Sequence, residues 1–112
     1  MTQSPSPCSL KKVLYPISDT LILICERCGS KICDDPLKNP SRELQKNLKA
    51  HFKEKGQSKQ KRPLVSSCLA LCPENEIAIA KISLKESLQN SYFSLAYENE
   101  AQATNDVLTL TD

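Results

Sequence analysis

Six cysteines in a chain of 112 residues are the feature that most restricts how this protein can fold. The chain opens MTQSPSPCSLKK, which lacks the charged segment and apolar run of a secretory signal, and its longest apolar run is too short to cross a membrane. We therefore expect a cytoplasmic protein with no membrane contact, whose cysteines stay reduced. Several cysteines at short, fixed spacings then indicate metal binding or redox chemistry.

The length predicts a single small domain. Residues 1–12 are expected to form a disordered tail, since most of this stretch is rich in Ser, Pro and Thr. Residues 13–100 are expected to form the domain, and residues 101–112 are left as a C-terminal tail of unassigned structure. With no Trp and few aromatic residues, the core must depend on Leu, Ile, Val and Ala.

The apolar pattern predicts a first strand in LILIC, ending at Cys25, followed by a loop over residues 26–39 that is rich in Gly, Asp and Pro. Asn39 or Ser41 can cap a helix that begins near Pro40 and ends at Gly56. In that helix every fourth residue is apolar along one stripe, formed by Leu44, Leu48 and Phe52.

A second strand is predicted in LVSS, leading into Cys68, and the alternating EIAIAKIS, residues 76–83, predicts a third. Beyond it we favour a helix that begins at a capping box from Ser83 to Glu86 and continues the stripe Leu84, Leu88 and Leu95. SYFSLAY could equally form a strand. The order predicts an α/β fold with a β-α-β core, a third strand and a C-terminal helix, in which the first two strands run parallel.

Five cysteines follow the ends of two predicted strands. Cys25 ends the first strand with Cys28 and Cys33 in the loop behind it, and Cys68 ends the second with Cys72 in its loop. Parallel strands would bring both groups to the carboxyl edge of the sheet, where open α/β sheets bind ligands. The N–H groups at the start of the helix near Pro40 would favour a negatively charged iron–sulfur centre at this edge.

The cysteine pattern resembles that of the thioredoxin-like 2Fe-2S ferredoxins, a family that includes the small iron–sulfur subunit of respiratory complex I. The resemblance covers roughly residues 20–82 and rests on LILIC, on a cysteine ahead of the helix, on CLALCP and on IAIAKI. It implies a thioredoxin-like fold and electron transfer by a 2Fe-2S cluster. The chain lacks the Gly-containing hairpin that the family has after its apolar strand.

The resemblance implies that the cluster ligands are Cys25, Cys33, Cys68 and Cys72. Cys28 competes for the place in the first loop, because Cys28 and Cys33 have the four-residue interval found in the complex I subunit. Three other interpretations stay open at this point. Cys25-x2-Cys28 could hold zinc together with Cys68 and Cys72, the thiols could bind nothing, or Cys25 and Cys28 could form a redox dithiol. A redox dithiol of the thioredoxin type lies at the start of a helix. Gly29 and the turn residues after it argue against a helix that begins at Cys25.

Few other residues point to chemistry. Residues 46–62 carry seven Lys or Arg against one Glu, which could dock an acidic redox partner, but the lack of interleaved aromatic residues argues against nucleic acid. His51 is the only histidine and is expected at the surface. No catalytic triad, paired carboxylates or phosphate-binding Gly loop is present, so we do not expect an enzyme. Whether the chain forms a homodimer stays open.

Overall fold

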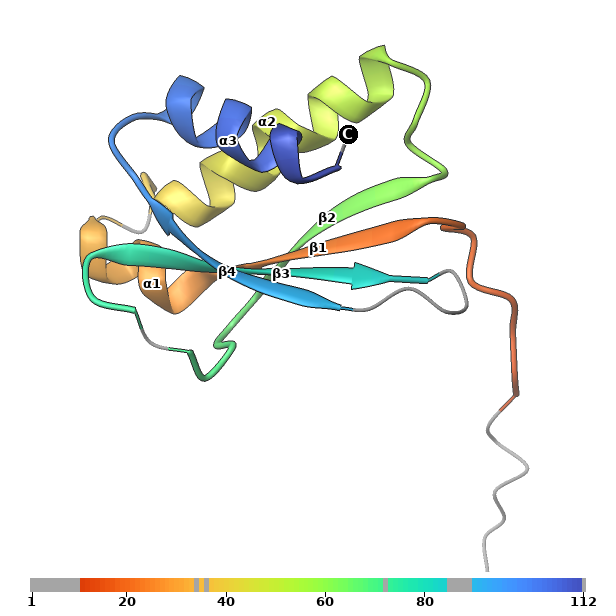
Figure 1. The fold of residues 1–112 in the computed structure, drawn as a ribbon, viewed down its shortest axis with the longest axis horizontal. Coiled ribbons are helices and arrows are strands. Elements are labelled where there is room, and N and C mark those ends of the chain that lie inside the picture. The colour runs from red at the N-terminus through yellow and green to blue at the C-terminus, as the bar shows by residue number, and fades with distance from the viewer. Residues whose placement is uncertain (1–10, 34, 36, 72, 85–89, 112) are drawn as a thin grey trace, which may run out of the picture.

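The computed structural model describes residues 11–33, 35, 37–71, 73–84 and 90–111. Its elements follow the order β1 (Thr20–Cys25), α1 (Glu26–Ile32), α2 (Pro40–Glu54), β2 (Lys61–Ser66), β3 (Glu76–Ser83), β4 (Ser91–Ala96) and α3 (Glu100–Thr111). The four strands form one sheet in the order β2-β1-β3-β4 (Figure 1). The predicted α/β fold, with its β-α-β core, third strand and C-terminal helix, is confirmed.

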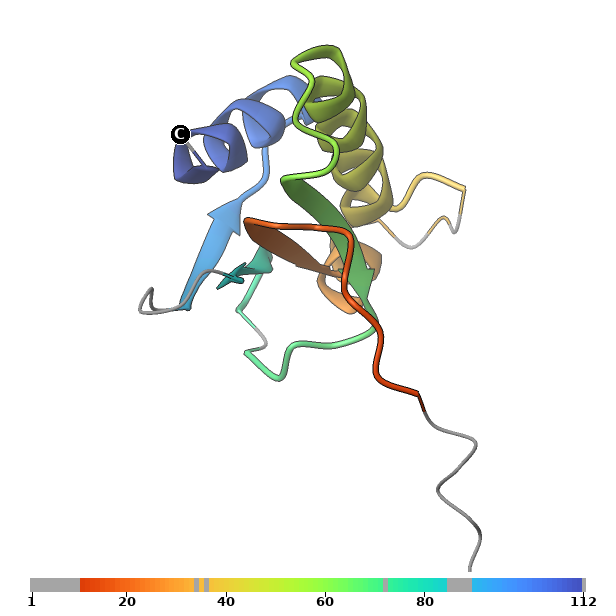
Figure 2. The ribbon, with the colours of Figure 1, turned by 90° about the vertical axis from the view of Figure 1, so that its right-hand side faces the viewer.

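The sheet is mixed because the two halves of the chain are connected differently. β1 and β2 pair in parallel across α2, with Cys25 beside Ser66, whereas β3 runs antiparallel to both β1 and β4. Helices α2 and α3 lie on the same side of this sheet (Figures 1 and 2). The carboxyl ends of β1 and β2 therefore share one edge, as the sequence predicted.

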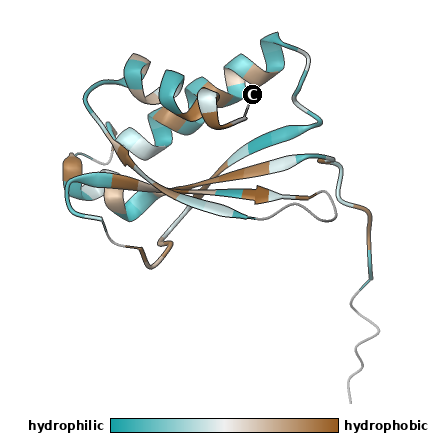
Figure 3. Cartoon of the chain, viewed as in Figure 1, coloured by the Kyte–Doolittle hydropathy of each residue, from teal (hydrophilic) through white to brown (hydrophobic). Residues whose placement is uncertain are grey.

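The core lies between the sheet and these two helices. Leu44, Leu48 and Phe52 of α2 are fully buried, as their spacing predicted, and they belong to one cluster with residues of β1, β3 and α3. Hydrophobic and hydrophilic residues alternate along both helices (Figure 3), and the apolar residues that the helices bury belong to the core cluster. β1 contributes Ile22, Ile24 and Cys25 to this cluster, and β3 contributes Ile77, Ala78 and Ile79.

Helix α2 begins and ends as its sequence predicted. The Asn39 side chain caps the helix by accepting hydrogen bonds from the amides of Ser41 and Arg42, and Pro40 occupies the first helical position. Gly56 follows the end of the helix with φ at +71°, a conformation that glycine adopts without strain. β3 covers the predicted stretch from Glu76 to Ser83.

Three expectations are wrong. Residues 26–32 form α1 instead of a loop, because the Cys25 sulfur caps the helix and Gly29 packs closely against the start of α2. β2 ends at Ser66, so Cys68 lies in the following loop and not at the strand end. The helical stripe does not extend to Leu95, because SYFSLAY takes the strand alternative: Leu95 lies in β4, where it pairs with Ile77 of the antiparallel β3. Leu88, Glu86 and Cys72 lie outside the described residues.

The C-terminal residues that the sequence left unassigned form α3, which buries Ala103 and Val107 in the core. Within the described part of the chain, no helix is both long enough and apolar enough to span a membrane.

Candidate thiol site between β1 and α1

Two cysteines adjoin where the chain passes from β1 to α1. Cys25 is the last residue of β1 and the N-cap of α1, and Cys28 lies in the first turn of the helix. The Cys28 amide donates a hydrogen bond to the Cys25 sulfur over 3.4 Å. Both side chains are almost inaccessible, with 2% and 3% of their surfaces exposed. The strand-to-helix junction therefore holds two neighbouring thiols inside the protein.

Hydrogen bonds shift the pKa values of the two thiols in opposite directions. Burial by itself raises the pKa of Cys25, but amides of Cys28, Leu69 and Arg27 and the Cys28 thiol all donate toward its sulfur, so its pKa is lowered overall. Burial raises the pKa of Cys28, and the neighbouring Cys25 raises it further. Cys25 is therefore the thiol of the pair that loses its proton more readily.

The loop after β2 reaches the same sulfur. β1 and β2 end side by side, and the Arg27 amide donates to the Ser67 carbonyl over 3.3 Å. The Leu69 amide contributes to lowering the pKa of Cys25, so the residue after Cys68 faces the Cys25 sulfur. The structure thus places the loop that contains Cys68 against Cys25.

Cys68 itself is exposed, and its sulfur accepts a hydrogen bond from the Ala70 amide over 3.3 Å. This local turn places Ala70 in the left-handed region, with φ at 62°. Among the described residues, no three His, Cys, Asp or Glu side chains lie close enough together to hold a metal ion. Cys72, in the same loop, is outside the described residues.

Cys33 lies at the other end of α1. It is the C-cap of the helix whose N-cap is Cys25, so the backbones of the two residues are separated by about 12 Å along the helix axis. Cys33 is near Tyr97 instead: burial raises the pKa of Tyr97, and the negative charges of Glu100, Glu43 and Cys33 raise it further. The structure brings Cys28, and not Cys33, to the Cys25 sulfur.

Polar residues at the start of α2 hold the β1 to α1 junction in place. The fully buried Ser41 hydroxyl donates to the Cys25 carbonyl over 2.6 Å. The Asn39 amide group donates to the Glu26 carbonyl and to the Ser30 hydroxyl, both over 3.1 Å. The sequence identified Asn39 and Ser41 only as helix caps. Gly29, a glycine between two predicted elements, was the available signal that two segments meet closely there.

We expect Ser41→Ala to lower the free energy of unfolding by about 1–3 kcal/mol, because the buried Cys25 carbonyl loses its hydroxyl donor. Urea unfolding followed by circular dichroism measures this change. Ser30→Ala is the matched control: the Ser30 hydroxyl bonds to Asn39 and Glu26 at the same junction, but it is exposed, so we expect its loss to cost less. Equal stability of Ser41→Ala and the unmodified protein would contradict the role of Ser41 in fixing this junction.

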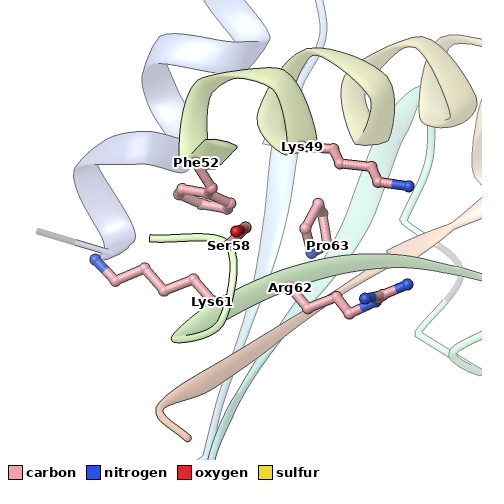
Figure 4. Close-up of a pocket in the computed structure, with 6 residues that line it drawn as sticks. All are labelled: Lys49, Phe52, Ser58, Lys61, Arg62 and Pro63. Atoms are coloured by element: carbon pink, nitrogen blue, oxygen red, sulfur yellow. The ribbon is translucent and has the colours of Figure 1, made fainter. Parts of the chain in front are cut away.

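The basic stretch lies at the opposite end of the sheet. It covers the last turns of α2 and the start of β2, where a hollow of about 50 Å³ is lined by Lys49, Phe52, Ser58, Lys61, Arg62 and Pro63. In Figure 4 the charged end of Lys61 points to one side of the hollow, and the charged ends of Lys49 and Arg62 point to the other side. The three charges therefore do not converge on one anion. β1 spans about 17 Å between this end and Cys25.

Comparison of the chain with protein-family models, with curated proteins and with solved structures gives no match.

Proposed function

We propose that this chain transfers single electrons through a 2Fe-2S centre held by cysteines at the β1 to α1 junction. The observation that carries the proposal is the Cys25 sulfur, which adjoins the Cys28 thiol and faces the amide of Leu69, the residue after Cys68. A bound centre of this kind supplies one-electron redox chemistry, and amide hydrogen bonds to its cysteine sulfurs help to set its potential.

The donor set at this junction suits such a centre. Cys25 and Cys28 supply two adjoining sulfurs, and the loop that packs against Cys25 supplies Cys68 and, by sequence, Cys72. Three backbone amides already point at the Cys25 sulfur, which stabilises a thiolate there. Contact with Cys25 favours Cys28 over Cys33 as the first-loop ligand. The order of strand, helix, strand and cysteine loop supports the resemblance to the thioredoxin-like 2Fe-2S ferredoxins.

The route for electrons follows from exposure. Cys25 and Cys28 are buried, whereas Cys68 is exposed, and nearby Leu71 is 47% exposed. A redox partner protein would therefore approach over the loop between β2 and β3. The basic end of the sheet lies too far from the thiols to serve as the entry point for electrons. The proposal places the protein in the cytoplasm, where free thiols persist.

Anaerobic purification followed by iron, zinc and sulfide analysis tests this function. We expect two irons and two sulfides per chain, and visible absorption that dithionite bleaches. A colourless protein with stoichiometric zinc would support a structural zinc site with cysteine ligands instead. A protein free of metal and sulfide after anaerobic reconstitution would contradict both.

Thiol–disulfide exchange at Cys25 and Cys28 is a second candidate, favoured by the start of α1. The objection that no helix begins there is wrong, because Cys25 caps α1 and Cys28 lies in its first turn. A lowered pKa on the first thiol and a raised one on the second suit attack and resolution, respectively. Burial of both sulfurs ranks this function second, since a disulfide substrate needs access to Cys25. Metal-free protein that forms this disulfide rapidly with glutathione disulfide would favour it.

A further inference from the structure

The sheet has one face that α2 and α3 do not cover. Ile22 and Ile24 lie in the core cluster with residues of α2, and successive strand residues point to opposite faces. Leu21 and Leu23 therefore point away from these helices, and both are only half-buried. Among the described elements, no helix covers this second face at the end where β1 begins (Figures 1 and 2).

Apolar side chains from all four strands lie on this second face. Leu23 pairs with Leu64 of β2, and Leu21 pairs with Ile82 of β3. Arg62 lies beside Leu21 on β2, at the border of the sheet. We define the open face by the apolar residues there that keep part of their surface exposed, which are Leu21, Leu23, Leu64, Ile82 and Tyr92. An apolar surface built from several strands indicates a place where another segment packs.

The segment that precedes β1 carries a second uncovered apolar surface. Val13, Leu14 and Tyr15 are consecutive, and 79%, 95% and 52% of their surfaces are exposed. Ile17 is buried and fixes this segment to the domain just before β1. Both views show the chain ahead of β1 on the side of the sheet opposite α2 and α3 (Figures 1 and 2). The segment and the open face therefore lie on the same side of the molecule.

We propose that residues 13–15 fold back across the open face and pack on Leu21, Leu23 and Ile82 as a strap. Apolar side chains of both surfaces leave water in this arrangement, which drives it. The tether favours this occupant, because a segment joined by a few residues has an effective concentration in the millimolar range. Ordering the segment opposes this gain, so the strap exchanges between a packed and a released state. The inference does not depend on the proposed electron transfer.

The length of the segment fits this path. The chain bends at Pro16 and again at Asp19, and reversal at these bends lays the segment antiparallel to β1. An extended chain rises about 3.3 Å per residue, so Tyr15 and Leu21 each lie up to about 10 Å from Ser18. The strap therefore reaches Leu21 first and covers the face from there toward the end of β1.

Charge supports the direction of the strap. Lys11 and Lys12 precede it, and the reversal carries them toward the end of the sheet where β3 begins. Glu74 comes just before β3, and Glu76 is its first residue. Glu76 lies on the same face as the exposed Ser94, whose hydroxyl donates a hydrogen bond to its carboxylate. Packing of the strap thus brings two basic residues toward two acidic ones.

Photo-cross-linking of the purified full chain tests the strap. A benzophenone amino acid in place of Leu14 should cross-link to residues 21–23 or to Ile82, which peptide mass spectrometry identifies. Mixing isotopically light and heavy chains shows whether the linked peptides come from one chain. The same amino acid in place of Leu37, an exposed leucine between α1 and α2, is the control and should not reach these residues. Cross-links that form only between chains, or to neither strand, would overturn the proposal.

Trypsin cleavage after Lys11 or Lys12 gives an independent measure, because a packed strap is cut only from its released state. Tyr15→Ser removes a packed side chain and should raise the cleavage rate by about threefold or more. Leu37→Ser, a similar change away from the open face, should leave that rate unchanged. Both positions lie outside the helices and strands, so the fold should persist, which circular dichroism verifies. Equal cleavage rates in Tyr15→Ser and the unmodified protein would contradict the strap.

Discussion

Replacing Gly29 with alanine should lower the free energy of unfolding by about 3 kcal/mol, although alanine favours a helix over glycine by about 1 kcal/mol. A Cβ at position 29 would lie 2.4 Å from Asn39 Oδ1, 2.5 Å from Ser41 Oγ and 2.9 Å from the Ser41 nitrogen. These atoms have little freedom to move: Asn39 Oδ1 accepts two amide hydrogen bonds, and Ser41 Oγ donates to the Cys25 carbonyl. The methyl group would therefore force α1 and α2 apart.

Urea unfolding monitored by circular dichroism measures the effect of Gly29→Ala. Gly56→Ala is the matched control, because nothing lies within 4 Å of a Cβ built at Gly56 and only its φ of +71° is unfavourable. We expect that control to lose about 1 kcal/mol through backbone strain. If Gly29→Ala lost no more stability than Gly56→Ala, the close packing of α1 against α2 would be wrong.

The same glycine explains why α1 was not predicted from the sequence. Gly29, followed by Asp and Pro residues, indicates a loop when only local preferences are considered. In the structure Gly29 serves close helix packing, and the cap comes from the sulfur of Cys25, which is not a common capping side chain. The determining contacts come from Asn39 and Ser41, residues of another element. Local sequence patterns do not predict contacts between residues of different elements.

Where burial is strong and regular, the sequence did predict the structure. The stripe of Leu44, Leu48 and Phe52 identified α2, and alternation identified β3. The C-terminal part lacks such patterns, since α3 buries chiefly Ala103 and Val107. The sequence between β3 and β4 contains no glycine, so it offered no turn signal from which this antiparallel pairing could be predicted.

The strand topology was enough to predict which edge of the sheet the cysteines share, but not which of them lie in contact. Parallel pairing of β1 and β2 predicted that Cys25 and the Cys68 loop would share a sheet edge, and the structure places them there. The choice between Cys28 and Cys33 depends on α1, which the sequence did not reveal. A helix keeps the third residue after its N-cap near that cap and carries the eighth residue away from it.

Cys28→Ser and Cys33→Ser should therefore differ sharply in cofactor content, if the chain holds a 2Fe-2S centre. We expect Cys28→Ser to lose most of its iron and sulfide, because its sulfur adjoins Cys25, and Cys33→Ser to retain nearly all of both. Cys25→Ser should behave like Cys28→Ser, because Cys25 receives the amide hydrogen bonds that stabilise a thiolate. Iron and sulfide analysis after anaerobic reconstitution, with circular dichroism to verify folding, measures all three variants.

The opposite pattern would have an equally definite meaning. If Cys33→Ser lost the cofactor while Cys28→Ser kept it, the ligand set would be the one that the ferredoxin resemblance implies, and α1 would have to unwind to bring Cys33 to Cys25. Retention in both variants would leave the first loop without a ligand other than Cys25. In a folded chain that result would mean that the centre does not lie at Cys25 and Cys28. A cluster that loses a thiolate ligand loses more binding free energy than a neighbouring side chain can restore.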